Sequence, residues 1–231
     1  MEMMKAAITP SKFRKNLFEK EAWAEKMVTC GVDEVGRGCL AGPLVAGAVI
    51  LPINTTYRNL KDSKLLSATE REQAFRWIEK NCWFSTGIVS SQLIDRYNIW
   101  NATLIAMKKA ILQLCATCPQ KPVSIVIDAM PVNLFDTSYK TVPIYNFPKG
   151  EQWSSSIAAA SIVAKVTRDR LMQTFDSLFP AYDFGQNKGY GTKKHKNALR
   201  LCGRCLIHRK SFLKNEISME NNERTYQQSI F

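Results

Sequence analysis

The feature that most constrains the fold is a pair of apolar segments joined by a short glycine-rich connection. Residues 43–51 (PLVAGAVIL) are almost wholly apolar, residues 30–35 (CGVDEV) are apolar apart from two acids, and three glycines lie in the connection. Runs of this length bounded by glycine are typical of β-strands, and two neighbouring strands on a short turn favour an antiparallel hairpin. The chain is therefore expected to build a β-sheet that includes this hairpin.

Downstream, strand-like segments alternate with long helical ones. Apolar runs at 83–89, 123–127 and 141–147 predict three further strands, and the unbroken run VSIVI at 123–127 is typical of a strand buried on both faces. Residues 91–115 and 155–175 predict two long helices. The apolar stripe of the first helix comprises Leu93, Tyr97, Trp100, Leu104 and Ile111. This order of elements predicts one α/β domain, a mixed sheet flanked by helices.

Positive charge is concentrated toward the C-terminus. Lys and Arg number 32 against 20 Asp and Glu, and the resulting net charge of +12 favours a polyanionic partner. Nine of these cations and both histidines, His195 and His208, fall within residues 188–214, which contain no Asp or Glu. Such a run can be a solvated face only, but a stretch this long without acids favours contact with phosphates.

The cysteines and the apolar pattern bear on location. Seven cysteines in a chain of domain size favour reduced thiols over a disulfide framework. Cys115/Cys118 and Cys202/Cys205 have the internal spacing of zinc-ribbon pairs, but they lie 84 residues apart (202 minus 118), so we expect small buried hydrophobes rather than a zinc site. No apolar run is long enough to span a membrane, and residues 1–26 mix charges where a secretory signal needs an apolar core. We expect a cytoplasmic protein.

Acidic residues occur where an α/β sheet brings side chains together. Asp33 and Glu34 interrupt the first apolar segment, Asp128 follows the strand VSIVI, and Glu151 lies just beyond the segment 141–147. Ligand sites of such sheets gather outside the carboxyl ends of strands. Carboxylates that share one cleft repel each other by about 4 kcal/mol per pair at about 4 Å and an effective dielectric near 20. Divalent cations relieve such repulsion, and oxygen-only ligands select Mg²⁺ or Mn²⁺, which commonly act on phosphates.

A plainer interpretation of the first two acids stays open. Asp33 and Glu34 could pair with Arg37 or lie at a solvated strand end. Successive side chains of a strand point to opposite faces, so both acids can serve one site only if the chain bends there, as Gly36 and Gly38 permit.

Seven sequence blocks follow one another between residues 30 and 212. They are GVDEVGRG with LAGP (31–43), DSKLL (62–66), VIDA (126–129), KGE (149–151), AAASIVAKVTRD (158–169), KGYGT with His195 (188–195) and HRKSF (208–212). On these blocks the sequence resembles ribonuclease HII, the type 2 ribonuclease H. The resemblance implies a ribonuclease H-like mixed sheet flanked by helices, with a small helical C-terminal part.

The resemblance also implies an activity and its residues. Members hydrolyse the RNA strand of RNA/DNA hybrids and cut 5′ of ribonucleotides embedded in DNA duplexes, leaving 3′-hydroxyl and 5′-phosphate ends, which serves removal of misincorporated ribonucleotides. Asp33, Glu34 and Asp128 match the first three acids of a site for two Mn²⁺ or Mg²⁺ ions, and Glu151 stands where the family usually has Asp.

Substrate contacts are implied by the same matches. Gly36, Arg37 and Gly38 match a loop whose backbone approaches the ribose 2′-hydroxyl, and Tyr190 matches a tyrosine that packs on the sugar at the RNA-to-DNA junction. The positions that match phosphate-holding residues are Lys188, Arg209, Lys210 and Ser211.

Alternatives to this interpretation differ in what they explain. Glu151 resembles the corresponding acid of ribonuclease HIII, but Arg37 and the absence of a long folded N-terminal extension favour ribonuclease HII; the longer side chain predicts a shift toward Mn²⁺. A nucleic-acid binding module without catalysis would explain the basic segment but not the acids. Another ribonuclease H-like nuclease, such as an exonuclease or recombinase, would share the acids but not the Gly-Arg-Gly and Lys-Gly-Tyr motifs.

Several polar residues have modest expected roles. Asp169 is expected to form an ion pair with Lys165 or a neighbouring Arg, and otherwise is the reserve candidate for a fourth acid. Asp62 is expected to cap a helix or turn. His195 is a candidate general acid or phosphate contact, although nothing local in the sequence fixes its tautomer.

The expected domain layout has three parts. Residues 1–28 form an N-terminal extension, 29–214 the catalytic domain with its basic helical segment from about 188, and 215–231 a tail. The last five residues, 227–231, loosely resemble short tails that dock on sliding clamps. We expect a monomer that binds an RNA/DNA hybrid or a ribonucleotide-containing duplex.

Overall fold

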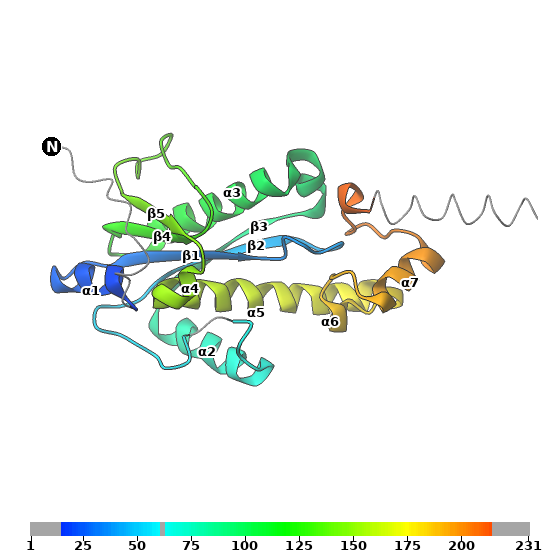
Figure 1. The fold of residues 1–231 in the computed structure, drawn as a ribbon, viewed down its shortest axis with the longest axis horizontal. Helices are drawn as coiled ribbons and strands as arrows, with labels where there is room; N and C mark the ends of the chain where they lie inside the picture. The colour runs from blue at the N-terminus through cyan, green and yellow to red at the C-terminus, as the bar shows by residue number, and fades with distance from the viewer. Residues whose placement is uncertain (1–14, 61–62, 214–231) are drawn as a thin grey trace, which may run out of the picture.

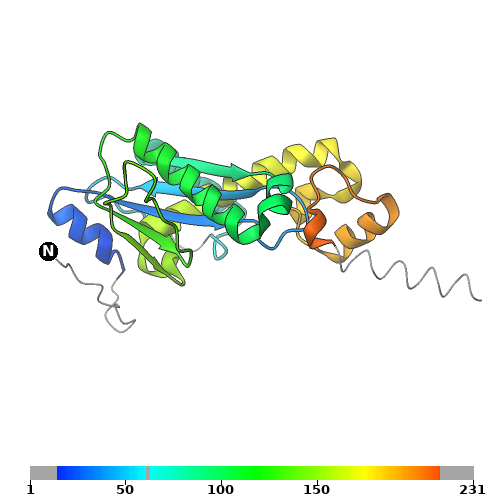
Figure 2. The same ribbon diagram turned by 90° about the horizontal axis from the view of Figure 1, so that it is seen from above.

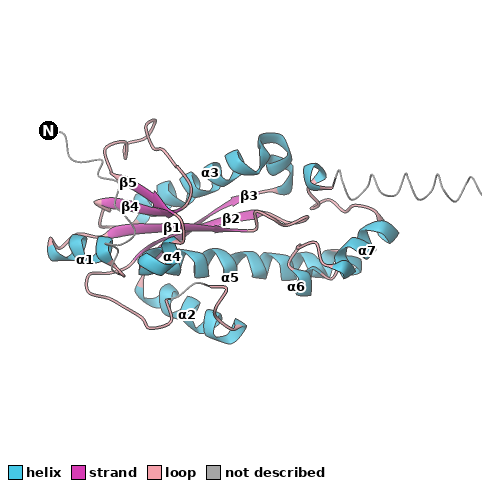
Figure 3. Ribbon diagram, in the orientation of Figure 1, coloured by secondary structure: helices cyan, strands magenta, loops and turns pink. Residues whose placement is uncertain are grey.

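A five-stranded mixed sheet forms the centre of the protein. The computed structural model describes residues 15–60 and 63–213. The strands are β1 (Thr29–Val35), β2 (Leu44–Ile50), β3 (Trp83–Val89), β4 (Ser124–Asp128) and β5 (Ile144–Phe147), in the order β3-β2-β1-β4-β5. β1, β2 and β3 pair antiparallel, whereas β4 and β5 run parallel to β1 (Figure 1, Figure 3). The predicted hairpin and the mixed α/β sheet are confirmed.

Helices cover both faces of the sheet. α3 (Ser91–Thr117) packs on one face, and α5 (Ser155–Leu178) packs on the other with α2 (Ala68–Asn81) beyond it (Figure 1). The short helices α6 (Phe184–Asn187) and α7 (Lys193–Cys202) extend from the far end of α5 and form the expected small C-terminal part (Figure 2). α1 (Leu17–Ala24) and α4 (Gly150–Trp153) lie at the opposite end, near the start of α5 (Figure 1).

Small residues let α5 approach β1 and β2 very closely. A Cβ on Gly31 would lie 2.1 Å from the carbonyl carbon of Ser156, and one on Gly47 would lie 2.4 Å from the carbonyl oxygen of Ala160. No side chain larger than hydrogen fits at either position, because the obstacle is the backbone of the helix. This close contact places the first turns of α5 directly against the strand that carries Asp33.

The stripe predicted for α3 is confirmed at Ile111, which is buried, and is wrong at Tyr97 and Trp100. Tyr97 and Trp100 are 41% and 48% exposed. Asn98 has non-helical angles (φ 62°, ψ 167°), and its side-chain oxygen accepts a hydrogen bond from the backbone N–H of Asn101 at 3.0 Å, which starts a second helix. The kink changes the helical phase, so the buried face after it comprises Ala102, Ala106, Met107, Ala110, Ile111 and Leu114.

The cysteines follow the prediction in part. Cys115 and Cys118 are buried at the end of α3, as expected, but Cys202 is exposed and Cys205 is partly buried. Cys202 is the last residue of α7, where residues 200–202 are all exposed. Within residues 15–60 and 63–213, no helix has both the length and the apolar character needed to cross a membrane.

Candidate active site at the carboxyl ends of β1 and β4

Strand pairing brings Asp33 and Asp128 together. β1 and β4 pair in parallel with Val32 opposite Ile127, so the next residue on each strand is an acid. Asp33 is only 8% exposed, and Asp128 is partly buried where β4 ends. The backbone N–H of Gly150 donates to Asp128 Oδ1 at 2.9 Å. Glu151, the next residue in α4, is thereby placed in the same region as the strand acids.

Burial and mutual repulsion dominate the electrostatics of this region. Burial raises the pKa of Asp33 well above its usual value, and the charges of Glu34 and Asp128 raise this pKa further, against hydrogen bonds from Ser161 and the Glu34 backbone. Burial also raises the pKa of Glu34, although Arg37 and Lys64 act in the opposite direction. The three acids therefore act on one another as a cluster with excess negative charge.

The ion pair expected between Glu34 and Arg37 is present, but it does not account for the acidic residues by itself. Arg37 Nη1 lies 3.7 Å from Glu34 Oε1, an ion pair with a side chain that is 38% exposed. This contact does not offset the cost of burial, because the pKa of Glu34 is still raised, first by burial and then by the charge of Asp128, with Arg37 acting against both. Asp33 and Glu34 are thus not explained by pairing with Arg37 alone.

The donor chemistry of the cluster fits a hard divalent cation. Its candidate ligands are carboxylate oxygens, whose pKa values are raised by burial and by one another's charge, and a bound cation would offset both effects. In the described part of the chain, however, no three His, Cys, Asp or Glu side chains are oriented around one common point. The convergence of all four carboxylates on one metal site therefore stays a prediction.

Sequence reasoning missed two contacts of Asp33 and Glu34. The Ser161 hydroxyl on α5 hydrogen-bonds Asp33 and lies 2.9 Å from the hydroxyl of Ser63. Lys64 acts on Glu34 through its charge. Ser63 and Lys64 belong to the block DSKLL, and the presence of this block among the matching motifs was the sequence feature that could have indicated these contacts. Asp62 of the same block lies outside the described residues.

Two buried arginines hold the loop between β1 and β2. Arg168 on α5 is 0% exposed, and its guanidinium donates to the carbonyls of Pro43 (2.8 Å), Lys188 (2.7 Å) and Ala41 (3.0 Å). Arg209 is also 0% exposed. It donates to the carbonyls of Gly42 at 2.9 and 3.1 Å and of Arg37 at 2.9 Å.

The expectation that Arg209 holds a phosphate is therefore not met. Its guanidinium is enclosed by the main chain that it binds, and burial lowers its pKa to about 10, which leaves it charged at neutral pH. The other predicted phosphate positions differ in exposure. Lys188 Nζ donates to the carbonyl of Gly185 at 2.5 Å, whereas Lys210 is exposed. The backbone N–H groups of Lys210 and Ser211 bind Asp95 at 2.8 and 2.9 Å, which fixes this short turn.

Tyr190 lies on the surface beside the same loop. Its side chain is 41% exposed, and the Arg168 guanidinium lies 5.9 Å from the centre of its ring. The backbone N–H of Leu40 donates to the carbonyl of Gly189 at 2.9 Å, so the loop that carries Tyr190 is joined to the loop that carries Gly36, Arg37 and Gly38.

His195 is buried and does not reach the surface. Its Nδ1 lies 2.8 Å from the Tyr190 carbonyl, and its Nε2 lies 3.0 Å from Nε2 of His208. Because His208 Nδ1 accepts from the backbone N–H of Cys205 at 3.0 Å, its proton is on Nε2, and the proton of His195 is on Nδ1. Burial lowers the pKa of both rings, that of His208 to about 4. The expected role as general acid or phosphate contact is replaced by a structural one.

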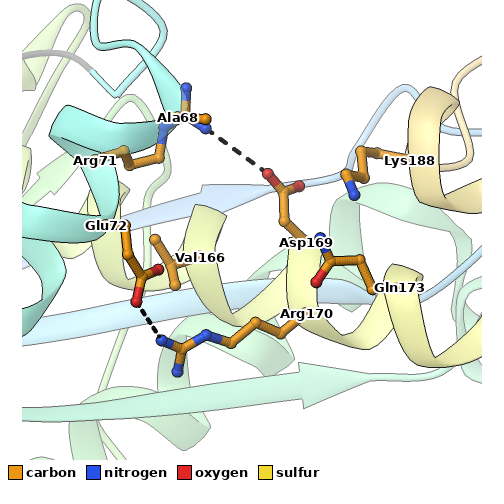
Figure 4. A pocket seen from close by; sticks show the side chains of 8 residues that line it. All are labelled: Ala68, Arg71, Glu72, Val166, Asp169, Arg170, Gln173 and Lys188. Carbon is orange, nitrogen blue, oxygen red and sulfur yellow. Dashed lines mark hydrogen bonds and ion pairs between the residues drawn. The ribbon is translucent and has the colours of Figure 1, made fainter.

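A pocket of about 260 Å³, lined mostly by charged residues, lies between α2 and α5 (Figure 4). Asp169 at its wall is bound by Lys165 at 2.7 Å and Arg71 at 3.8 Å, which confirms the expected ion pair. Arg170 crosses the pocket to Glu72 at 2.9 Å. Lys188 lies at the far side of the pocket, and none of the four predicted acids lines it.

Comparison with known proteins identifies the family. Residues 30–215 match the family described as ribonuclease HII. Ribonuclease HII of Listeria monocytogenes serotype 4b (strain F2365) is 48% identical over 183 residues, which cover 79% of this chain and 66% of that protein. The match thus spans slightly less than two thirds of that relative's length.

Solved structures share the fold. Ribonuclease HII in the PCNA:RNase HII complex from Archaeoglobus fulgidus has a TM-score of 0.65 at 26% identity, covering 80% of this chain and 94% of that chain. Bst-RNase HIII in complex with Mn²⁺ has a TM-score of 0.64 at 18% identity, covering 87% of this chain and 73% of that chain. The sequence blocks, the ribonuclease H-like fold and the family match agree, and the chain belongs to the ribonuclease HII family.

Proposed function

We propose that this protein is a divalent-metal-dependent endoribonuclease that hydrolyses the RNA strand of RNA/DNA hybrids and cuts 5′ of ribonucleotides embedded in DNA duplexes. The observation that carries the proposal is the cluster of Asp33, Glu34 and Asp128 at the ends of β1 and β4, where burial and then mutual repulsion raise the pKa of the first two. A protein that only binds nucleic acid has no use for such a cluster, since acids oppose phosphate binding unless cations intervene.

The four acids would hold two Mg²⁺ or Mn²⁺ ions. When bound, such ions supply Lewis acidity for the attack of water on the phosphodiester and for departure of the 3′ oxygen, which gives 3′-hydroxyl and 5′-phosphate ends. Asp33 and Asp128 stand on rigid strand ends, whereas Glu151 stands on a short helix joined to Asp128 through Gly150. Bst-RNase HIII, a protein of the same fold, was solved in complex with Mn²⁺, which supports a divalent cation as the cofactor.

The loop of Gly36, Arg37 and Gly38 would read the ribose. A Cβ on Gly38 would meet nothing within 4 Å, so the main chain there is open to a ligand. Gly36 has a φ of +94°, and a Cβ there would lie 2.3 Å from the Arg168 side chain. An exposed backbone held by buried arginines can place its polar groups at a fixed distance from a 2′-hydroxyl. Tyr190 would pack on the neighbouring sugar.

The surroundings of the site suit a nucleic-acid duplex. The exposed lysines at the start of α7, Lys193 and Lys194, would contact phosphates. The archaeal ribonuclease HII was solved with PCNA, which supports a sliding clamp as a partner of this chain; the tail expected to dock, residues 227–231, lies outside the described residues. We also propose that the protein is a monomer and that it acts in the cytoplasm on misincorporated ribonucleotides.

Cleavage of a DNA duplex with one internal ribonucleotide tests the function. We expect a single cut 5′ of the ribonucleotide in Mg²⁺ or Mn²⁺, and none in excess EDTA. An all-DNA duplex of the same sequence should stay intact. Binding of both duplexes without any cut in either metal would show a binding module, and degradation from the ends would show an exonuclease.

Substituting Glu151 by Asp should change the metal preference. Because Asp is shorter by one methylene, its oxygens reach a different position, and we expect the ratio of activity in Mn²⁺ to that in Mg²⁺ to fall by about tenfold. Initial rates across a series of concentrations of each metal measure this ratio. Glu79→Asp, an exposed position on α2, is the matched control. Identical metal profiles for wild type and Glu151→Asp would rule out a role of the longer side chain.

A further inference from the structure

The N-terminal helix α1 packs on the segments that carry the acidic cluster. Phe18 is 6% exposed, and its ring stacks on Phe147 of β5 with centroids 5.6 Å apart and planes 9° from parallel. The hydroxyl of Thr29, at the start of β1, donates to the Phe18 carbonyl at 3.3 Å. Figure 1 shows α1 at the end of the sheet where α4 and α5 begin. α1 is therefore part of the domain rather than an appendage to it.

Two polar side chains of this region bind the start of α5. The Asn16 side-chain oxygen accepts from the backbone N–H of Ser155 at 2.9 Å. Glu19 Oε1 accepts from the backbone N–H of Ser156 at 3.0 Å and from the hydroxyl of Ser154 at 2.5 Å. The first N–H groups of a helix have no partners within the helix, so acceptors from α1 complete this end.

Glu19 is an acidic residue whose burial costs desolvation free energy. It is 1% exposed, and its Oε2 has no hydrogen-bond partner among the described residues. The positive end of the α5 dipole offsets part of this cost, because Glu19 lies at the first turn of that helix. The Glu19 carboxylate thus binds the N-terminus of α5. An apolar side chain at this position could cover that end of the helix but could not bind its N–H groups.

The contacts of α1 lie at one end of the segment that carries Glu151. Residues 150–156 start at Gly150, whose N–H binds Asp128, and they end at the serines bound by Glu19. Between these points, the backbone N–H of Asn16 donates to the carbonyl of Trp153, the last residue of α4, at 2.7 Å. The short helix with Glu151 is therefore fixed on one side by Asp128 and on the other by α1.

We propose that Asn16 and Glu19 are positioning residues of the acidic centre. They hold residues 150–156 in place, and thereby keep Glu151 at a set position beside Asp128. This inference rests on the proposed function, since it assigns to α1 a part in metal binding. It implies that loss of Glu19 weakens metal binding with little effect on the affinity for duplex, because α1 lies at the opposite end of the molecule from the basic helix α7.

The test measures Mn²⁺ binding directly, from the signal of free Mn²⁺ in electron paramagnetic resonance. We expect Glu19→Gln to weaken Mn²⁺ binding by about 5- to 10-fold, below the roughly 10- to 100-fold effect of a residue that binds a metal ligand directly. The metal concentration for half-maximal cleavage should rise equally, high Mn²⁺ should restore the rate, and the KM for the duplex should stay unchanged. Glu21→Gln, an exposed position on the same helix, is the matched control and should behave as wild type.

A second variant guards against loss of folding. Asn16 has a φ of 62°, so Asn16→Gly keeps the backbone conformation and removes only the side chain that binds Ser155. This variant should also weaken Mn²⁺ binding. A lower thermal midpoint with unchanged Mn²⁺ affinity in both variants would overturn the inference. If wild type itself neither binds Mn²⁺ nor cuts, the proposed function fails; if wild type does both and the variants match it, only the positioning role fails.

Discussion

Asp33→Asn is expected to reduce cleavage of a ribonucleotide-containing duplex by about 10³-fold, because the charge stabilisation that a bound cation supplies is worth several kcal/mol and each 1.4 kcal/mol is tenfold in rate. Asn keeps the size of the side chain and part of its hydrogen bonding, so the loss reports the missing charge. Single-turnover cleavage at saturating Mn²⁺ measures the effect.

The same variant should be more stable than wild type when metal is absent. Burial and the charges of Glu34 and Asp128 raise the pKa of Asp33, so the ionised carboxylate destabilises the folded state at neutral pH. Asn has no such charge, and its advantage should be complete above the folded-state pKa and vanish as the pH falls below the usual value for Asp. Thermal unfolding in EDTA at several pH values tests this sign.

Added metal should reverse the order of stability. A ligand that binds only the folded state at 100 times its Kd stabilises it by about 2.7 kcal/mol, and Asp33→Asn should lose most of this gain. Asp136→Asn is the control, because Asp136 is exposed and pairs with Lys108. Cleavage by Asp33→Asn within tenfold of wild type, with an unchanged metal response in unfolding, would contradict the role given to Asp33.

The acidic cluster could be predicted because it follows from local pattern. Asp128 follows a buried strand, and ligand sites gather outside the carboxyl ends of strands, so a shared cleft for Asp33 and Asp128 could be predicted, whereas their parallel pairing is a finding of the structure. The interrupted helix at Asn98 was not predicted, since apolar spacing alone cannot show that the helical phase changes midway. The buried roles of Arg209 and His195 also escaped, because basic residues in a basic segment are expected on the surface.

Arg168 shows why such roles require the tertiary structure. Its three acceptors are main-chain carbonyls at residues 41, 43 and 188, which have no signature in the sequence. Asn16 and Glu19 are similar, since they bind backbone and serines 135 to 139 positions away. Patterns of side-chain polarity predict which faces are buried, whereas partners on the main chain depend on how loops meet after folding.

Arg168→Met is expected to lower the free energy of unfolding by about 3 kcal/mol. Buried carbonyls left without donors cost about 1 to 3 kcal/mol each, and the variant recovers part of this because it no longer buries a charge. For a domain of this size, the thermal midpoint should fall by roughly 6 to 12 °C. Arg170→Met on the same helix is the control. Arg170 forms an exposed ion pair with Glu72 and lies over the Phe75 ring, contacts worth about 1 kcal/mol or less together.

Activity should fall further than stability explains. At a temperature where Arg168→Met is fully folded, we expect kcat/KM on a single-ribonucleotide duplex to drop by about 10²-fold, because a displacement of about 1 Å in a substrate-positioning loop has effects of this size. Arg168→Lys should not restore activity, since one ammonium cannot bind three carbonyls in the planar arrangement of the guanidinium. Full activity in Arg168→Lys would show that a buried charge is sufficient, and that the three directed hydrogen bonds do not position the loop.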